Sequence, residues 1–251
     1  MRVLLAMWRM ARVLVHLGHG MILMALRFER MTVQQRHAMV QWWSRKLLAV
    51  VGLSLTVNGQ ARQAGGLLIA NHVSWLDIAV LHAACPQARF VSKADVRKWP
   101  LLGWLIAGVG TLFIERERKR DAMRMVHDMA AALQRGETVA VFPEGTTGAG
   151  AQTLPFHANL LQAAIAVEAP IIPAALRYSE PGHAFAWSAQ YIDDTTLVQS
   201  IWRVVSARGL AVELTILPPH GSAHADRRAL AAHMQAQIQQ VLDAAPSSSS
   251  A

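Results

Sequence analysis

The sequence predicts a single α/β domain with a mixed central sheet flanked by helices, preceded by a helical segment that associates with a membrane. From about residue 65 onwards, short apolar runs alternate with longer mixed segments, which is typical of strands and helices in one α/β unit. No repeat, long linker or composition break interrupts this pattern. We therefore expect a membrane-associating segment over residues 1–62, one domain over residues 63–245 and a disordered tail over residues 246–251.

The composition and the placement of charge predict the membrane-associating segment. Of the 251 residues, 53% are apolar and only 16% are charged, against ~25% charged in an ordinary soluble domain. The net charge of +8 lies in residues 1–62, with nine basic residues and one acid, whereas the rest holds fifteen of each sign. A nucleic-acid binder needs a basic stripe on its folded domain, so nucleic acid is not an expected partner. Basic residues among Leu, Met and Trp favour an anionic lipid surface.

The first expected helix is too short in its uncharged part to span a bilayer. Residues 13–26 carry no Lys, Arg, Asp or Glu, and as a helix they reach about 21 Å at ~1.5 Å per residue, against ~30 Å of hydrocarbon. We expect a helix that lies in or dips into the interface and a second helix around Thr32–Val50, with Trp42 and Trp43 as anchors. The alternative is an amphipathic helix packed on the domain. Retention of basic residues at the cytoplasmic side places the domain there.

The domain itself is expected to contain six strands and two clear long helices. The helix over Lys119–Arg135 is apolar on one face and is followed by Gly136, and the helix over Ala223–Ala245 is stopped by Pro246. The expected strands are Leu67–Ala70, Ala88–Val91, Thr111–Ile114, Thr138–Phe142, Ile171–Tyr178 and Leu210–Leu217.

The strongest chemical candidate follows the first of these strands. His72 and Asp77 are five residues apart, with the aspartate on the opening turn of an expected helix. A carboxylate there can hold one ring nitrogen of the histidine, while the other nitrogen takes a proton from a substrate hydroxyl. Ser74 lies between them and is expected to cap the helix. Backbone amides just after His72 or near Gly145 are candidates for stabilising an oxyanion.

Two further segments strengthen this interpretation. The strand Thr138–Phe142 runs into Pro-Glu-Gly-Thr-Thr-Gly, residues 143–148, a glycine-rich loop with a carboxylate and hydroxyls that can bind a polar ligand. The strand Thr111–Ile114 is followed by Glu-Arg-Glu-Arg, residues 115–118, and arginine suits a phosphate or a carboxylate. By themselves, Arg116 and Arg118 are more simply interpreted as a solvated start of a helix.

Taken together with Ala-Pro-Ile-Ile-Pro-Ala at residues 169–174, the segments NHVSWLD, GTLFIERER and FPEGTTG resemble the four ordered blocks of the glycerolipid acyltransferases. The resemblance covers roughly residues 65–180. It implies transfer of a fatty acyl group from an acyl thioester, on coenzyme A or acyl carrier protein, to a lysolipid hydroxyl, with no metal or other cofactor. The implied roles are catalysis by His72 and Asp77, acceptor binding by Arg116, Glu144, Gly145, Thr146 and Lys93, and an acyl-donor site bordered by Pro173.

The third block departs from the pattern that the resemblance implies for phosphatidic-acid-forming enzymes. Those enzymes usually carry an arginine where this chain has Thr147, and a charge-assisted contact to phosphate contributes ~1.5–3 kcal/mol. The expected acceptor is 1-acyl-sn-glycerol-3-phosphate, with lyso-ornithine lipid as the alternative. A thioesterase that uses water, and a membrane-binding protein without catalysis, are the remaining alternatives.

Overall fold

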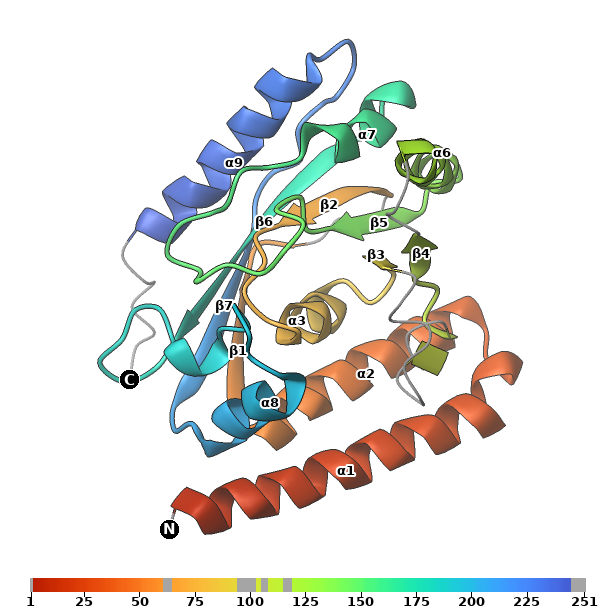
Figure 1. Ribbon diagram of the computed structural model, residues 1–251. Helices are drawn as coiled ribbons and strands as arrows, with labels where there is room; N and C mark the ends of the chain where they lie inside the picture. The colour runs from red at the N-terminus through yellow and green to blue at the C-terminus, as the bar shows by residue number, and fades with distance from the viewer. Residues whose placement is uncertain (1, 61–64, 94–102, 105–107, 115–118, 245–251) are drawn as a thin grey trace.

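The protein is described by a computed structural model that covers residues 2–60, 65–93, 103–104, 108–114 and 119–244 (Figure 1). Its described strands form one seven-stranded sheet in the order β1-β7-β6-β2-β5-β3-β4. Only β6 and β7 pair antiparallel, and the other neighbours are parallel, which confirms a mixed central sheet. The strands are β1 (Leu53–Asn58), β2 (Gly66–Ala70), β3 (Arg89–Lys93), β4 (Leu112–Ile114), β5 (Thr138–Val141), β6 (Ile171–Ser179) and β7 (Leu210–Ile216).

One strand was not expected from the sequence. Residues 53–58 were assigned to the N-terminal helical segment, but they form β1, which pairs in parallel with β7 from Leu53 opposite Leu210 to Asn58 opposite Thr215. The stretch alternates apolar and polar residues, which is the pattern of a strand with one buried face. The sheet therefore begins before residue 62, and a domain boundary at that position would separate β1 from its partner.

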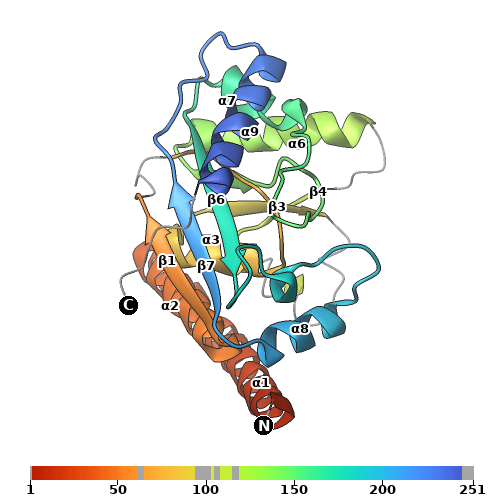
Figure 2. The ribbon, with the colours of Figure 1, turned by 90° about the vertical axis from the view of Figure 1, so that its left-hand side faces the viewer.

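Helices cover both faces of the sheet (Figures 1 and 2). One face carries α6 (Lys119–Gln134), α7 (Gln162–Ala166) and α9 (Arg227–Asp243). The other carries α2 (Val33–Val51) and α3 (Leu76–Ala84), with α1 (Arg2–Leu26) and α8 (Leu197–Ser206) packed outside them. The helices expected at residues 32–50, 119–135 and 223–245 are thus confirmed within a few residues.

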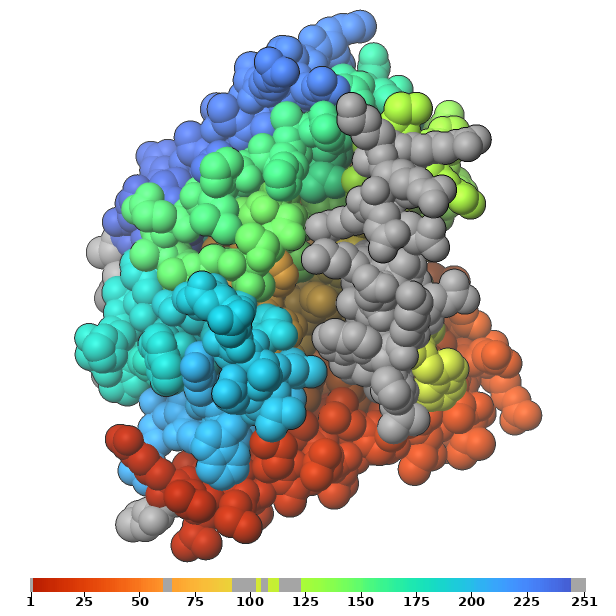
Figure 3. All heavy atoms as spheres, in the orientation of Figure 1, coloured from red at the N-terminus to blue at the C-terminus, as the bar shows by residue number. Residues whose placement is uncertain are grey.

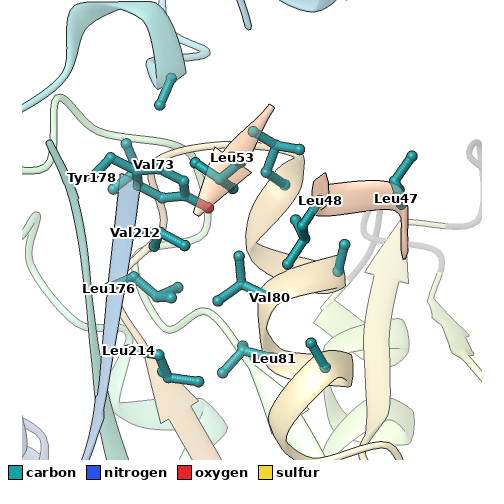
Figure 4. Close-up of a cluster of buried hydrophobic side chains, with 14 of the residues drawn as sticks. Leu47, Leu48, Leu53, Val73, Val80, Leu81, Leu176, Tyr178, Val212 and Leu214 are labelled. Carbon is teal, nitrogen blue, oxygen red and sulfur yellow. The ribbon is translucent and has the colours of Figure 1, made fainter. Parts of the chain in front are cut away.

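The two hydrophobic cores follow the alternation of side chains along the strands. On β6, Ile171 and Ala175 belong to the core beneath α6, α7 and α9. Leu176 and Tyr178 point to the opposite core, where Figure 4 shows them with Val212 and Leu214 of β7 opposite Val80 and Leu81 of α3. The central strands β2, β5 and β6 are buried almost throughout, as expected for parallel strands with helices on both faces.

The N-terminal helices are part of this packing. Thr32 begins α2 with a reciprocal capping box to Gln35, and His16 of α1 stacks on Trp43 with ring centroids 4.9 Å apart. Trp43 therefore holds the two helices together, and the expectation that it anchors the protein at a surface is wrong. Trp42 remains 45% exposed. Among the described residues, no helix combines the length and the apolarity needed to cross a membrane.

Candidate active site

The site lies where the parallel strands end. The strands β2 and β5 are neighbours with Ile69 opposite Val141, so the segments that follow them emerge side by side at the carboxyl edge of the sheet. Ligands bind outside this edge in open α/β sheets. Figure 3 shows a depression beside α8, with recessed orange and gold atoms, the colours of β2 and α3, at its floor. Two of the sequence blocks meet here.

His72 and Asp77 form the pair that their spacing predicted. The imidazole Nδ1 lies 2.7 Å from Asp77 Oδ2. The carboxylate accepts a hydrogen bond from Nδ1–H, and this tautomer leaves the lone pair on Nε2. The side chain of His72 is 20% exposed, while that of Asp77 is fully buried. The ring therefore meets solvent on one side and a fixed carboxylate on the other, as a general base requires.

The aspartate is held by four hydrogen bonds. Besides the histidine, Oδ2 accepts from the backbone N–H groups of Val73 at 2.7 Å and Ser74 at 3.0 Å. The hydroxyl of Tyr178 donates to Oδ1 at 2.6 Å. A buried carboxylate needs such donors because each replaces a lost contact with water. Sequence reasoning missed Tyr178, since nothing local links it to a residue 101 positions earlier.

The predicted capping role of Ser74 is wrong. The helix α3 begins at Leu76, its N-cap position is Trp75, and no side chain caps it. The Ser74 hydroxyl is buried without a hydrogen-bond partner among the described residues. The carboxylate of Asp77 binds the amides of this turn instead. Because the Val73 and Ser74 amides donate to that carboxylate, they are not available to stabilise an oxyanion.

The loop after β5 begins with a β-turn that fixes the predicted Pro-Glu-Gly segment. The Gly145 N–H donates to the Phe142 carbonyl at 3.1 Å, with Pro143 at the second position, where its fixed φ suits the turn. Gly145 has φ +72°, and a Cβ there would lie 3.0 Å from the ring of His157. Both the backbone conformation and the close approach therefore favour glycine.

This loop forms hydrogen bonds with both the N–H and the carbonyl of His72. The His72 N–H donates to Glu144 Oε1 at 3.1 Å, and the His72 carbonyl accepts from the Gly148 N–H at 2.7 Å. The Phe142 ring stacks on the imidazole, with centroids 4.0 Å apart and planes 9° apart. The two blocks thus form one rigid unit around the histidine.

Burial changes the acidity of Glu144. Glu144 is only 5% exposed. Burial, together with the charge of Asp77, raises the pKa of its carboxyl group from 4.5 to about 7. Backbone amides of His72 and Leu154 donate to the carboxylate and oppose this rise. The Glu144 side chain is engaged in holding the His72 loop. Its contribution to the site in this structure is to position backbone atoms.

The two threonines of the block have different surroundings. Thr146 is exposed at the loop surface. Thr147, which stands where an arginine was expected, donates its hydroxyl to the backbone carbonyl of Tyr191. The Tyr191 N–H in turn donates to the Val73 carbonyl at 3.0 Å. Thr147 therefore connects the loop to the segment before α8.

The remaining predicted site residues are not brought to His72 by the described contacts. Lys93 ends β3, but its side chain, like Arg116 and Arg118, lies outside what the structure describes. Pro173 lies within β6 opposite Ile69, and alternation along the strand places it on the face of Ile171, opposite to Tyr178. Its carbonyl accepts from the Leu217 N–H at 2.9 Å.

The fold and the site define an α/β protein in which a buried carboxylate orients a histidine, an arrangement suited to activating a hydroxyl. Comparison with known proteins identifies the family. A family model described as Acyltransferase matches residues 54–177, and the chain belongs to this acyltransferase family. It is an acyltransferase, and the resemblance noted from its four blocks is confirmed.

Individual relatives cover most of the chain. It is 36% identical to the lyso-ornithine lipid O-acyltransferase of Pseudomonas aeruginosa, over 82% of this chain and 79% of that protein. It is 34% identical to the 1-acyl-sn-glycerol-3-phosphate acyltransferase of Neisseria meningitidis serogroup B, over 83% and 82%. The crystal structure of the 1-acyl-sn-glycerophosphate acyltransferase from Thermotoga maritima shares the fold, with a TM-score of 0.75 at 19% identity over 97% of both chains.

Proposed function

We propose that this acyltransferase moves a fatty acyl group from an acyl thioester to the free hydroxyl of 1-acyl-sn-glycerol-3-phosphate, giving phosphatidic acid. The observation that carries the proposal is the His72–Asp77 pair, 2.7 Å apart at the carboxyl edge of the sheet. The similarity to enzymes named for lysolipid acceptors supports the acceptor class.

The chemistry needs one base that serves twice. The lone pair on Nε2 of His72 takes the hydroxyl proton as the acceptor oxygen attacks the thioester carbonyl, and Asp77 stabilises the imidazolium that forms. When the tetrahedral intermediate collapses, the carbon–sulfur bond breaks and His72 returns the proton to the leaving sulfur. The products are an ester and a free thiol. The acceptor oxygen is itself the nucleophile, so no acyl-enzyme is required.

A second acceptor, lyso-ornithine lipid, is favoured by the position of Thr147. Its hydroxyl is directed to a backbone carbonyl of the neighbouring segment, so the third block offers a structural contact where the expected arginine would offer a cation to phosphate. Relatives named for each acceptor match the chain at similar identity.

The test offers both acceptors to one enzyme. The purified, detergent-solubilised protein is given labelled acyl-CoA or acyl carrier protein with lysophosphatidic acid and with lyso-ornithine lipid in parallel. We expect transfer to lysophosphatidic acid. Preference for the ornithine acceptor would replace the first proposal by the second. Hydrolysis of the thioester at equal rates with and without acceptor would contradict both and indicate a thioesterase.

We further propose that the protein works on the cytoplasmic face of a membrane, through α1. Large apolar side chains are exposed along this helix. The guanidinium of Arg12 lies over Trp8, 4.3 Å from the ring centroid. Apolar and basic side chains on one helix are suited to an anionic interface. The exposed apolar residues of α1 are Val3, Leu4, Met7, Trp8, Leu14, Val15, Ile22 and Leu26.

Sedimentation with vesicles tests this surface. We expect the protein to bind vesicles of phosphatidylglycerol more tightly than vesicles of phosphatidylcholine, and the double variant Leu4→Ser, Val15→Ser to bind both weakly. Met123→Ser, which alters an equally exposed residue on α6, is the matched control and should bind as the unmodified protein does. Equal binding by the double variant would exclude α1 as the docking element.

A further inference from the structure

The hydroxyl of Tyr178 lies at the back of the catalytic pair. Tyr178 is the second-last residue of β6, where the strand continues past the end of β2. Its side chain crosses the core beneath α3 (Figure 4) and its hydroxyl donates to Asp77 Oδ1 at 2.6 Å. The ring is 2% exposed. Tyr178 therefore contacts the carboxylate oxygen that does not contact His72.

The two oxygens of Asp77 have different partners. Oδ2 accepts from His72 Nδ1 and from two backbone amides, whereas Oδ1 accepts from the Tyr178 hydroxyl. A carboxylate is planar, so fixing both oxygens fixes its rotation about the Cβ–Cγ bond. That rotation decides whether Oδ2 stays in line with the imidazole. A hydrogen bond to a charged group is about twice as strong as one between neutral groups.

The hydroxyl keeps its proton across the working range. Burial and the neighbouring Asp77 charge both raise the pKa of Tyr178 well above its ordinary value of 10. The group is thus a permanent donor to the aspartate. A donor at Oδ1 also draws negative charge away from Oδ2, which moderates how strongly the carboxylate favours the protonated imidazole.

We propose that Tyr178 is a positioning residue for the acyl transfer: through its hydrogen bond to Asp77 it fixes the orientation of the carboxylate and limits its basicity toward His72. This rests on the catalytic role proposed for the pair. A core tyrosine whose hydroxyl merely needed a partner would affect stability alone. A positioning residue also changes how the rate depends on pH and acts only while Asp77 carries its charge.

Tyr178→Phe removes the donor and keeps the ring. We expect kcat to fall about tenfold, the loss of one hydrogen bond to a charged group. KM should not change, because the buried Tyr178 hydroxyl contacts Asp77 and is not exposed to solvent. The acid limb of the pH–rate profile should shift to higher pH, since a more basic carboxylate holds the imidazolium more strongly. Among the described residues, Glu144 is the other titratable side chain that hydrogen-bonds to His72, so the shift should persist in the Glu144→Gln background.

Two matched experiments separate positioning from packing. Tyr191→Phe removes the chain's only other tyrosine hydroxyl, for which the described part of the chain shows no partner, and should leave the profile in place. In the Asp77→Asn background, Tyr178→Phe should cause little further loss of rate, because the residue acts through the carboxylate. A tenfold loss in both backgrounds, or an unshifted acid limb, would overturn the proposal.

A stronger donor provides a test that does not depend on a deletion. With Tyr191→Phe in place, 3-fluorotyrosine supplied during expression labels only Tyr178, and fluorine makes the phenol a better donor. The acid limb should then move to lower pH, opposite to the shift in Tyr178→Phe. The absence of opposite shifts in two folded proteins would contradict the role. The absence of any acyl transfer by the unmodified protein would instead contradict the proposed function. The two results distinguish a failure of the Tyr178 proposal from a failure of the proposed function.

Discussion

Two successive residues of β6 show how the two faces of the sheet divide stability and chemistry. Arg177 and Tyr178 are both buried, at 6% and 2% exposure, and alternation points them to opposite faces. The Arg177 guanidinium donates to the carbonyls of Val241, Leu242 and Ala244 at the end of α9. Tyr178 donates to Asp77. The two residues are similarly buried but differ in role, because Arg177 donates to backbone carbonyls and Tyr178 donates to the carboxylate of Asp77.

The face with α9 contains structural polar contacts. A cation at the carboxyl end of a helix satisfies carbonyls that have no partner within the helix and interacts favourably with the helix dipole. The face with α3 contains the His72–Asp77 pair, to which we assign the reaction. Substitutions on the two faces should thus separate rate from stability.

The largest effect is expected for His72→Ala. Removal of the base should lower the rate by a factor of about 10²–10⁴. The free energy of unfolding should change little, because Asp77 Oδ2 keeps two backbone amide donors. Acyl transfer and urea unfolding are measured together. His127→Ala, on exposed α6 surface of the other face, serves as the control. A folded His72→Ala enzyme with full activity would contradict the mechanism.

Asp77→Asn should affect both properties. Its amide presents N–H where three donors converge on Oδ2, so the preferred tautomer and orientation of His72 are lost. We expect a rate about 10²–10³ lower together with a lower urea midpoint. Asp128→Asn, exposed on α6, is the matched substitution. A drop in stability without a drop in rate would show that the aspartate only supports the turn.

Arg177→Met should affect stability alone. Loss of the contacts to three carbonyls is expected to lower the free energy of unfolding by about 1–3 kcal/mol, with the pH–rate profile unchanged. Urea unfolding and the profile of the same preparation test this. A shifted pH–rate profile would show that the two faces are coupled, so that stability and rate would not be separated between them.

The smallest effect concerns Glu144 and pH. A carboxyl with pKa about 7 in the folded protein and about 4.5 in the unfolded chain binds more proton when folded, so its contribution makes stability fall as pH rises from about 4.5 to 7. Glu144→Gln should remove this slope while keeping an oxygen that accepts from the His72 amide. The difference in unfolding free energy between the two proteins, followed over that pH range, measures it. Exposed Glu168→Gln should retain the slope, and identical curves for Glu144→Gln and unmodified protein would show that Glu144 titrates normally.

Local pattern was sufficient for much of the fold and for the centre of the site. Six strands, three long helices and the His72–Asp77 pair all followed from alternation, helix-end signals and a spacing of five residues, because each depends on neighbours along the chain. The strand β1 could have been found by its alternation, but its basic, apolar surroundings favoured a membrane helix. Trp43 was assigned to a surface for the same reason.

What only the tertiary structure decided is the set of contacts between distant segments. Glu144 and Gly148 can hydrogen-bond to the His72 backbone only because β2 and β5 are neighbours in the sheet. The contact of Tyr178 with Asp77 depends on β6 extending past β2 beneath α3. Sequence alone predicted that His72 and Asp77 form a pair. The order of strands determined which residues hold them in place, because that order joins segments that no local pattern relates.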